Sequence, residues 1–141
     1  MGCVHKKYFL SMRKETRNWL KMAEYDITTA EHMLTSGRYV YVVFMCHLSI
    51  EKMMKAIVSE ETGKTPPKTH NLLYLLKLGK VAPPQSLHDF ISVINNASIP
   101  TRYPEDFDKL IEVYPEEISR NYLKKTQEVL KWLKQDNRLK E

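Results

Sequence analysis

The segment RYVYVVFMCHLSIEKMMKAIVSEE, residues 38–61, decides the fold class of this chain. Its first half is apolar on nearly every side, and taken alone it would suit a buried strand as well as a helix. The second half continues at helical spacing through Leu48, Met54 and Val58 without a helix breaker. A helix this apolar must be covered by others, so we predict that it is the central helix of an all-α fold.

Amphipathic segments on both sides predict the helices that cover it. Upstream, residues 13–36 place apolar side chains three or four apart, and Gly37 follows as a residue that favours helix ends. Downstream, the expected helices cover residues 71–78, residues 85–97 and the residues from Pro115 onward. The sequence therefore predicts an antiparallel bundle of four to five helices.

The segments between these helices are expected to be loops and turns. Thr69 or His70 is predicted near the N-cap of the first shorter helix. Two prolines between residues 95 and 108 predict an irregular stretch, because proline restricts the residue before it to extended backbone. Residues 110–114 are expected to add one helical turn.

The composition is that of one globular domain. The chain has 141 residues, of which 43% are hydrophobic and 28% charged, so it can bury a real core. We expect the bundle to occupy residues 13–134. A flexible segment, residues 1–12, is predicted before it, and a fraying tail, residues 135–141, after it.

The cysteines and the hydropathy of the sequence indicate the cellular compartment. Cys3 and Cys46 form no disulfide or zinc pattern, which is typical of the reducing cytoplasm and predicts no metal site. No apolar run has the length that spans a bilayer, so no membrane partner is expected. The net charge of +5 permits nucleic-acid binding without requiring it.

The sequence contains none of the common catalytic motifs. Its 4 glycines form no phosphate-binding loop, there is no nucleophile elbow, and its 5 histidines include no HExxH pair. We therefore assign no catalytic residue and expect no cofactor.

Polar residues interrupt the central helix at regular intervals. His47, Glu51 and Lys55 are four residues apart, so one helix carries all three on neighbouring turns. A buried polar group without a partner costs about 1–3 kcal/mol, so something must satisfy them. One interpretation is an internal ion pair of Glu51 with Lys55 or Lys52. The other is a pocket whose missing partner is a ligand or a second subunit.

Two further segments offer candidate site residues. His70 is either a helix-cap or loop residue or part of a binding site. Arg102 and Tyr103 lie in the proline-bounded stretch, where a guanidinium fork suits phosphate or carboxylate and a tyrosine ring suits stacking. Alternatively, Arg102 pairs with a neighbouring acid and Tyr103 covers the edge of the core.

Charge is unevenly distributed along the last third of the chain. The last helix is basic, which suits RNA weakly and suits a solvated helix surface equally well. The stretch before it, residues 105–117, is acidic. This polarity favours protein–protein complementarity as much as nucleic-acid binding.

Four segments, in order, resemble the HEPN domain family. They are residues 19–26 (WLKMAEYD), 47–56 (HLSIEKMMKA), 69–72 (THNL) and 101–104 (TRYP). The resemblance runs over residues 13–134. It implies a small bundle of the nucleotidyltransferase substrate-binding type, usually a homodimer, in bacteria or archaea. It also implies a minimal nucleotidyltransferase as partner in a toxin–antitoxin-like pair, and a nucleotide as ligand.

The chain departs from the family's ribonuclease motif, an Arg followed four to six residues later by a His. No histidine follows Arg102 at any spacing. We therefore expect a non-catalytic, homodimeric binding module whose cleft unites three segments of the chain. The residues expected in it are His47, Glu51, Lys52, Lys55, His70, Arg102 and Tyr103. The alternatives are a ribonuclease toxin with a rearranged active site and a purely structural helical dimer.

Overall fold

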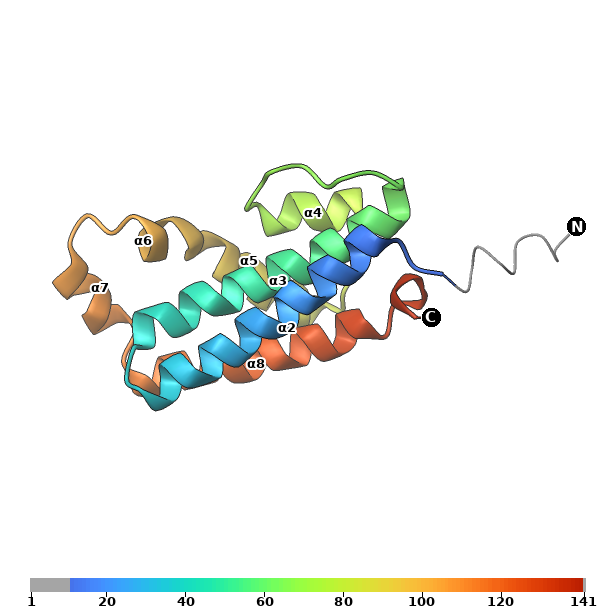
Figure 1. Ribbon diagram of the computed structural model, residues 1–141. Coiled ribbons are helices and arrows are strands. Elements are labelled where there is room, and N and C mark those ends of the chain that lie inside the picture. The colour runs from blue at the N-terminus through green and yellow to red at the C-terminus, as the bar shows by residue number, and fades with distance from the viewer. Residues whose placement is uncertain (1–10, 141) are drawn as a thin grey trace, which may run out of the picture.

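The computed structural model describes residues 11–140, and every regular element in that range is helical (Figure 1). Two long helices, α2 (Lys14–Thr35) and α3 (Tyr39–Thr62), form an antiparallel hairpin closed at Gly37, whose φ is +78°. A third long helix, α8 (Glu116–Lys134), packs along both. The prediction of an all-α bundle is confirmed.

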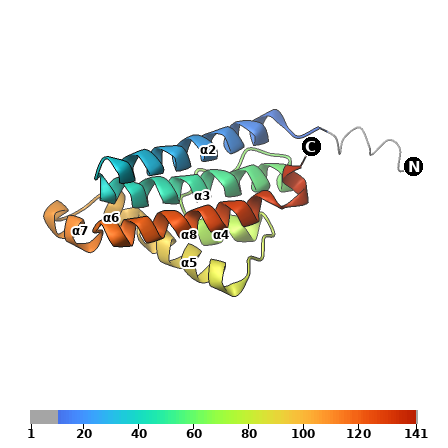
Figure 2. The ribbon, with the colours of Figure 1, turned by 90° about the horizontal axis from the view of Figure 1, so that it is seen from below.

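Short helices complete the bundle on the remaining side of α3. They are α4 (Leu72–Leu78), α5 (Gln85–Asn96), α6 (Ser98–Arg102) and α7 (Phe107–Val113). In Figure 2, α2 and α5 lie on opposite sides of α3, and α7 lies at the end of the molecule opposite the start of α2. None of the helices in residues 11–140 combines the length and apolar character that crossing a bilayer requires.

Helix α3 is the most buried helix, as its sequence predicts, although Tyr41 in its first turn is exposed. Val42, Ile50 and Ile57 are fully buried in the main core, which α2, α4, α5 and α8 complete. A smaller core cluster joins the first turns of α3 to α6 and α7 through Val43 and Leu110. These contacts hold α6 and α7 against the polar face of α3, where the candidate site lies.

The connections agree with the predictions at one point and differ at another. Thr69 and His70 lie just before the N-cap of α4, as predicted; the N-cap itself is Asn71, whose side chain accepts a hydrogen bond from Tyr74 N at 3.1 Å. The stretch predicted as irregular contains α6 and the start of α7. Helix α6 tolerates Pro100 because a proline in the first turn removes only an N–H that has no helical partner.

The tail after Gln135 is also ordered, contrary to the prediction that it frays. A 3₁₀-helix, η1 (Asn137–Leu139), places Leu139 in the main core. Arg138 donates to Asp136 and Glu61, at 2.7 and 2.9 Å, and to the carbonyl of Gly79. At the other end, the side chain of Met12 is buried. Residues 1–10 lie outside the described residues.

We expect Arg138→Ala to lower the free energy of unfolding by about 1–2 kcal/mol, because it frees both the tail and Glu61. Urea denaturation followed by circular dichroism measures this. Lys140→Ala is the matched control, since Lys140 is exposed on the same segment. Equal stabilities of the two variants would contradict a stabilising role for the Arg138 contacts.

Candidate functional site

Glu51 is the centre of a buried polar cluster. Its carboxylate is 2% exposed, in the middle of α3. One oxygen, Oε1, accepts a hydrogen bond from His70 Nδ1 at 2.8 Å and lies 3.5 Å from an amino group of Arg102. The other, Oε2, accepts from Lys55 Nζ at 3.1 Å. The structure therefore brings together residues from three separate segments, as the sequence predicts; we call His47, Glu51, Lys55, His70 and Arg102 the Glu51 cluster.

The side chain of Lys55 is buried together with that of Glu51. Its side chain is 7% exposed, and its ammonium lies 5.4 Å from the ring centroid of Trp19 on α2. The ring face attracts the cation, so Trp19 and Glu51 together replace the water that Lys55 loses. The internal ion pair expected under the structural interpretation is thus present, with Lys55 and not Lys52 as the cation.

His47 is neutral in this cluster. Burial lowers the pKa of His47 to about 4, against the usual 6.5. Arg102 lies 3.3 Å from His47 Nδ1, and a guanidinium can only donate, so Nδ1 accepts and Nε2 carries the proton. Nε2 is buried and has no hydrogen-bond partner among the described residues. The ring therefore adds no charge near Glu51 at neutral pH.

Arg102, the last residue of α6, carries more donors than its protein partners use. Its guanidinium carbon lies 5.0 Å from the ring centroid of Phe44, and the side chain is 13% exposed. Within residues 11–140 its buried Nε has no hydrogen-bond partner. Arg102 Nη1 also makes no hydrogen bond within that range and, unlike Nε, is not buried, so it can donate to a further group.

An open pocket of about 400 Å³ adjoins the cluster. It is lined by His70, Asn71, Asn95, Asn96, Ser98, Ile99, Arg102 and Tyr103. His70 is 57% exposed here, and Tyr103, just beyond α6, is 75% exposed. We call this the His70 pocket; His70 and Arg102 are the members of the Glu51 cluster that line it.

One predicted site residue lies elsewhere. Lys52 turns toward α2 and donates to Asp26 at 2.9 Å, away from Glu51. Successive helical residues are about 100° apart around the axis, so Lys52 and Glu51 face different neighbours. Lys52 therefore does not lie with the other predicted site residues, contrary to the prediction.

Sequence reasoning missed the amides of the pocket. Asn71 Oδ1 caps α4, and Asn95 Oδ1 accepts from Leu72 N at 2.8 Å. Because both oxygens accept from the backbone, both NH₂ groups remain to donate. Asparagine before an apolar helical run is a common N-cap signal, which could have found Asn71. No local signal marks Asn95.

The charges of the Glu51 cluster do not cancel. Lys55 and Arg102 are two cations, Glu51 is one carboxylate, and His47 is neutral, which leaves one positive charge beside a pocket rich in hydrogen-bond donors. Uncompensated buried charge is costly. The arrangement is suited to an anion. In the described part of the chain, no three His, Cys, Asp or Glu side chains group closely enough to hold a metal ion.

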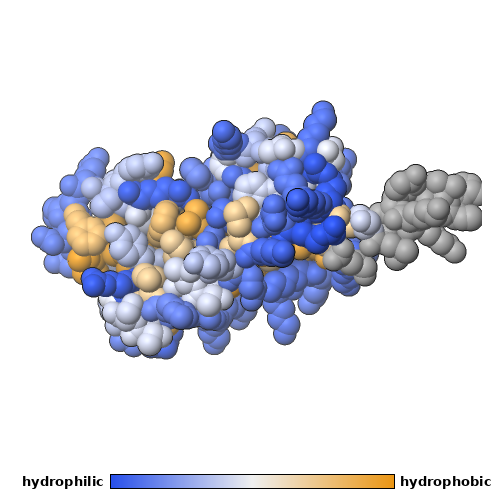
Figure 3. All heavy atoms as spheres, in the orientation of Figure 1, coloured by the Kyte–Doolittle hydropathy of each residue, from blue (hydrophilic) through white to orange (hydrophobic). Residues whose placement is uncertain are grey.

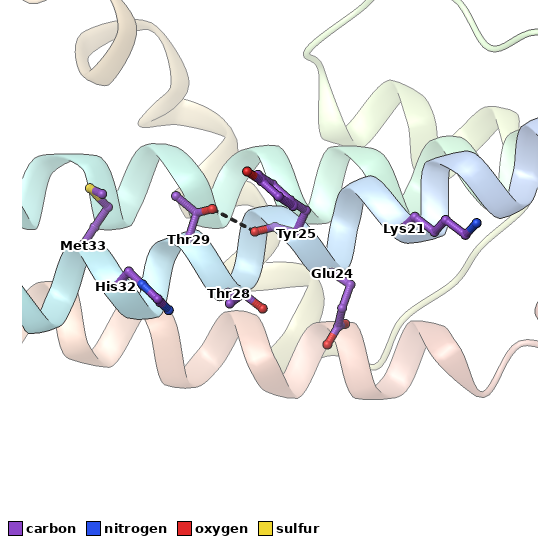
Figure 4. A pocket seen from close by; sticks show the side chains of 7 residues that line it. All are labelled: Lys21, Glu24, Tyr25, Thr28, Thr29, His32 and Met33. Atoms are coloured by element: carbon purple, nitrogen blue, oxygen red, sulfur yellow. Dashed lines mark hydrogen bonds between the residues drawn. The ribbon is translucent and has the colours of Figure 1, made fainter.

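A larger hollow, of about 620 Å³, lies on the outer face of α2. Figure 4 shows that its seven lining side chains all project from that one helix, with Thr29 Oγ1 donating to the carbonyl of Tyr25 at 2.9 Å. None of the ionisable side chains that line it is buried. The outer face of α2 therefore lacks the convergence of segments that marks the Glu51 cluster.

Comparisons with known proteins identify relatives of this chain. The family model described as the HEPN domain matches residues 16–136. TT1696 from Thermus thermophilus is 23% identical, with a TM-score of 0.72 over 86% of this chain and 98% of that one. ST0689, an archaeal HEPN homologue, is 22% identical, with a TM-score of 0.71 over 89% and 99%. No curated protein sequence matches.

Proposed function

The chain belongs to the HEPN domain family, and from that premise we propose that it is a non-catalytic binding module for an anionic ligand, a nucleotide in particular. One observation carries the proposal: the Glu51 cluster holds one more cation than anion beside the His70 pocket. An anion in that pocket would compensate the charge. The phosphate of a nucleotide supplies it.

The polar wall of the pocket supports phosphate recognition. Arg102 has a free, solvent-accessible donor in Nη1, and the NH₂ groups of Asn71 and Asn95 make no hydrogen bond within residues 11–140. Phosphate oxygens only accept, and bonds from a guanidinium to them are among the stronger hydrogen bonds in proteins. The donors thus match phosphate oxygens in kind.

The apolar wall supports recognition of a base. Tyr103 and Ile99 flank the pocket and are 75% and 69% exposed. Aromatic side chains bind nucleobases by stacking, worth about 1–3 kcal/mol per base. A volume of about 400 Å³ falls within the range of small-molecule sites.

We further propose that the protein is a cytoplasmic homodimer of a bacterium or archaeon, which partners a minimal nucleotidyltransferase in a toxin–antitoxin-like pair. Family membership supports this part. The uneven charge, acidic before α8 and basic along it, supports association with another protein.

Titration of the purified protein with ATP, adenosine and inorganic phosphate by calorimetry tests the ligand. We expect ATP to bind, and Arg102→Gln to weaken it about 10- to 100-fold, the effect of losing one charge-assisted hydrogen-bond donor. Arg120→Gln is the control, because Arg120 is exposed and paired with Glu116 on α8. Absence of heat with every ligand would refute the nucleotide proposal.

A second candidate function, RNA cleavage at a rearranged site, is favoured by the Glu51–His70 contact. Glu51 accepts from His70 Nδ1, so Nε2 of a neutral ring is left to take up a proton, an arrangement used in general base catalysis. Incubation with cellular RNA distinguishes the two functions. Cleavage that is lost in both Lys55→Ala and His70→Gln would replace the binding proposal by an enzyme.

The structural dimer, the third alternative, is favoured by the closed Glu51–Lys55 pair. That pair uses one carboxylate oxygen and one cation, so it leaves Arg102 and the donors of the His70 pocket unexplained. A protein that binds no nucleotide and cleaves no RNA, yet dimerises, would support it.

A further inference from the structure

The surface formed by α6 and α7 exposes many large apolar side chains. Five large apolar side chains are 47–75% exposed there: Ile99, Tyr103, Phe107, Ile111 and Val113. Figure 3 shows apolar surface gathered at the end of the molecule that α7 forms. Single exposed apolar residues are ordinary, but a group of this kind marks an interaction surface.

A groove of about 380 Å³ runs through this surface, and its rim is acidic. Glu105 and Asp106 line it together with Lys109. Residues 105–112 hold four carboxylates and Lys109 alone as a base, a net charge of −3 in a chain of net charge +5. We call this the α6–α7 groove.

The acidic rim is not neutralised from within the molecule. Glu105 and Asp106, the two carboxylates that line the groove, make no ion pair with any residue in the range 11–140. Like charges facing one another oppose association, so this surface is a poor match for its own copy in a two-fold contact. It requires an occupant with positive charge and large apolar side chains.

The start of the chain has that chemistry. Residues 1–10, MGCVHKKYFL, contain Lys6 and Lys7, no acid, and the apolar run Tyr8, Phe9 and Leu10. We propose that residues 6–10 of a second copy of this chain dock in the α6–α7 groove, with the two lysines against its acidic rim. This rests on the homodimer of the proposed function and names the surface and segment that form it.

Docking within one molecule is excluded by reach. Residues 6–10, fully extended, span about 18 Å from Ser11. Helix α2, with 22 residues, is about 33 Å long, and α7 lies beyond its far end (Figure 1). The segment therefore reaches only the groove of another molecule, where its charge and apolar content are both matched.

Charge reversal in the full chain tests the proposal, with the dimer dissociation constant measured by analytical ultracentrifugation. We expect Lys6→Glu combined with Lys7→Glu to raise it at least about tenfold. Addition of Glu105→Lys with Asp106→Asn, which keeps an N-cap side chain on α7, should restore most of the loss. Lys124→Glu with Lys125→Glu, two adjacent exposed lysines of α8, is the control and should leave it unchanged.

The outcomes separate this proposal from the proposed function. A dimer that the Lys6 and Lys7 reversals do not weaken, or that the compensating substitutions do not restore, overturns the docking of residues 6–10 while the homodimer stands. A monomer at every concentration overturns both. Nucleotide binding is decided independently by the titration of Arg102→Gln.

Discussion

Replacement of Glu51 by alanine is expected to lower the free energy of unfolding by about 3–5 kcal/mol, the usual effect of removing one partner from a buried ion pair. The reason is that Lys55 and Arg102 stay buried while the carboxylate that both face is gone. Urea denaturation followed by circular dichroism measures the loss.

Two further variants identify the origin of that loss. Glu116→Ala removes a carboxylate from an exposed pair, with Arg120 at 2.7 Å, and should cost about 1 kcal/mol or less. Lys55→Met should cost less than Glu51→Ala, because Arg102 and His70 still face the carboxylate. A Glu51→Ala loss no larger than that of Glu116→Ala would show that the cluster is not desolvated as described.

Stability is expected to fall by about 3 kcal/mol between pH 6.5 and pH 4 through His47 alone, at 1.36 kcal/mol per pKa unit. Burial lowers the pKa of His47 from 6.5 to about 4, so below pH 6.5 the unfolded chain binds a proton that the folded chain refuses. The contribution of neutral His47 to the free energy of unfolding is complete above pH 6.5 and is lost as the pH falls toward 4.

A matched pair of variants isolates this effect from the titration of carboxylates. His47→Leu keeps an apolar group of similar size at the position and removes the proton site, so its stability should fall less steeply over that interval. His32→Gln, on the exposed face of α2, should retain the steep fall of the parent protein. Parallel stability curves for His47→Leu and the parent protein would contradict a depressed pKa.

Periodicity predicted the long elements and the central place of α3, because burial of an apolar stripe is a property of the local sequence. It failed at α6, where Pro100 was interpreted as a breaker although it lies in a first turn. It failed at the tail, because the partners of Arg138 are Glu61 and the carbonyl of Gly79, distant in sequence.

The candidate site was predicted in part for the same reason. Spacing placed His47, Glu51 and Lys55 on one helix face, and residue type and position in the connecting segments made His70 and Arg102 candidates. Spacing alone did not show that Lys52 turns to Asp26, because that choice depends on where α2 packs. Nor did it show the surplus charge of the cluster, which arises because Arg102 of α6 joins Lys55 beside the single carboxylate of Glu51.

The walls that close over Glu51 are formed by short helices. Helices α4 and α6 have 7 and 5 residues, far below the length at which a helix persists on its own in water. Their order depends on docking, so they are the elements that transient local opening should release first, with fast amide hydrogen exchange. Each such opening would rehydrate Glu51 and give a ligand a route of entry that needs no motion of the long helices.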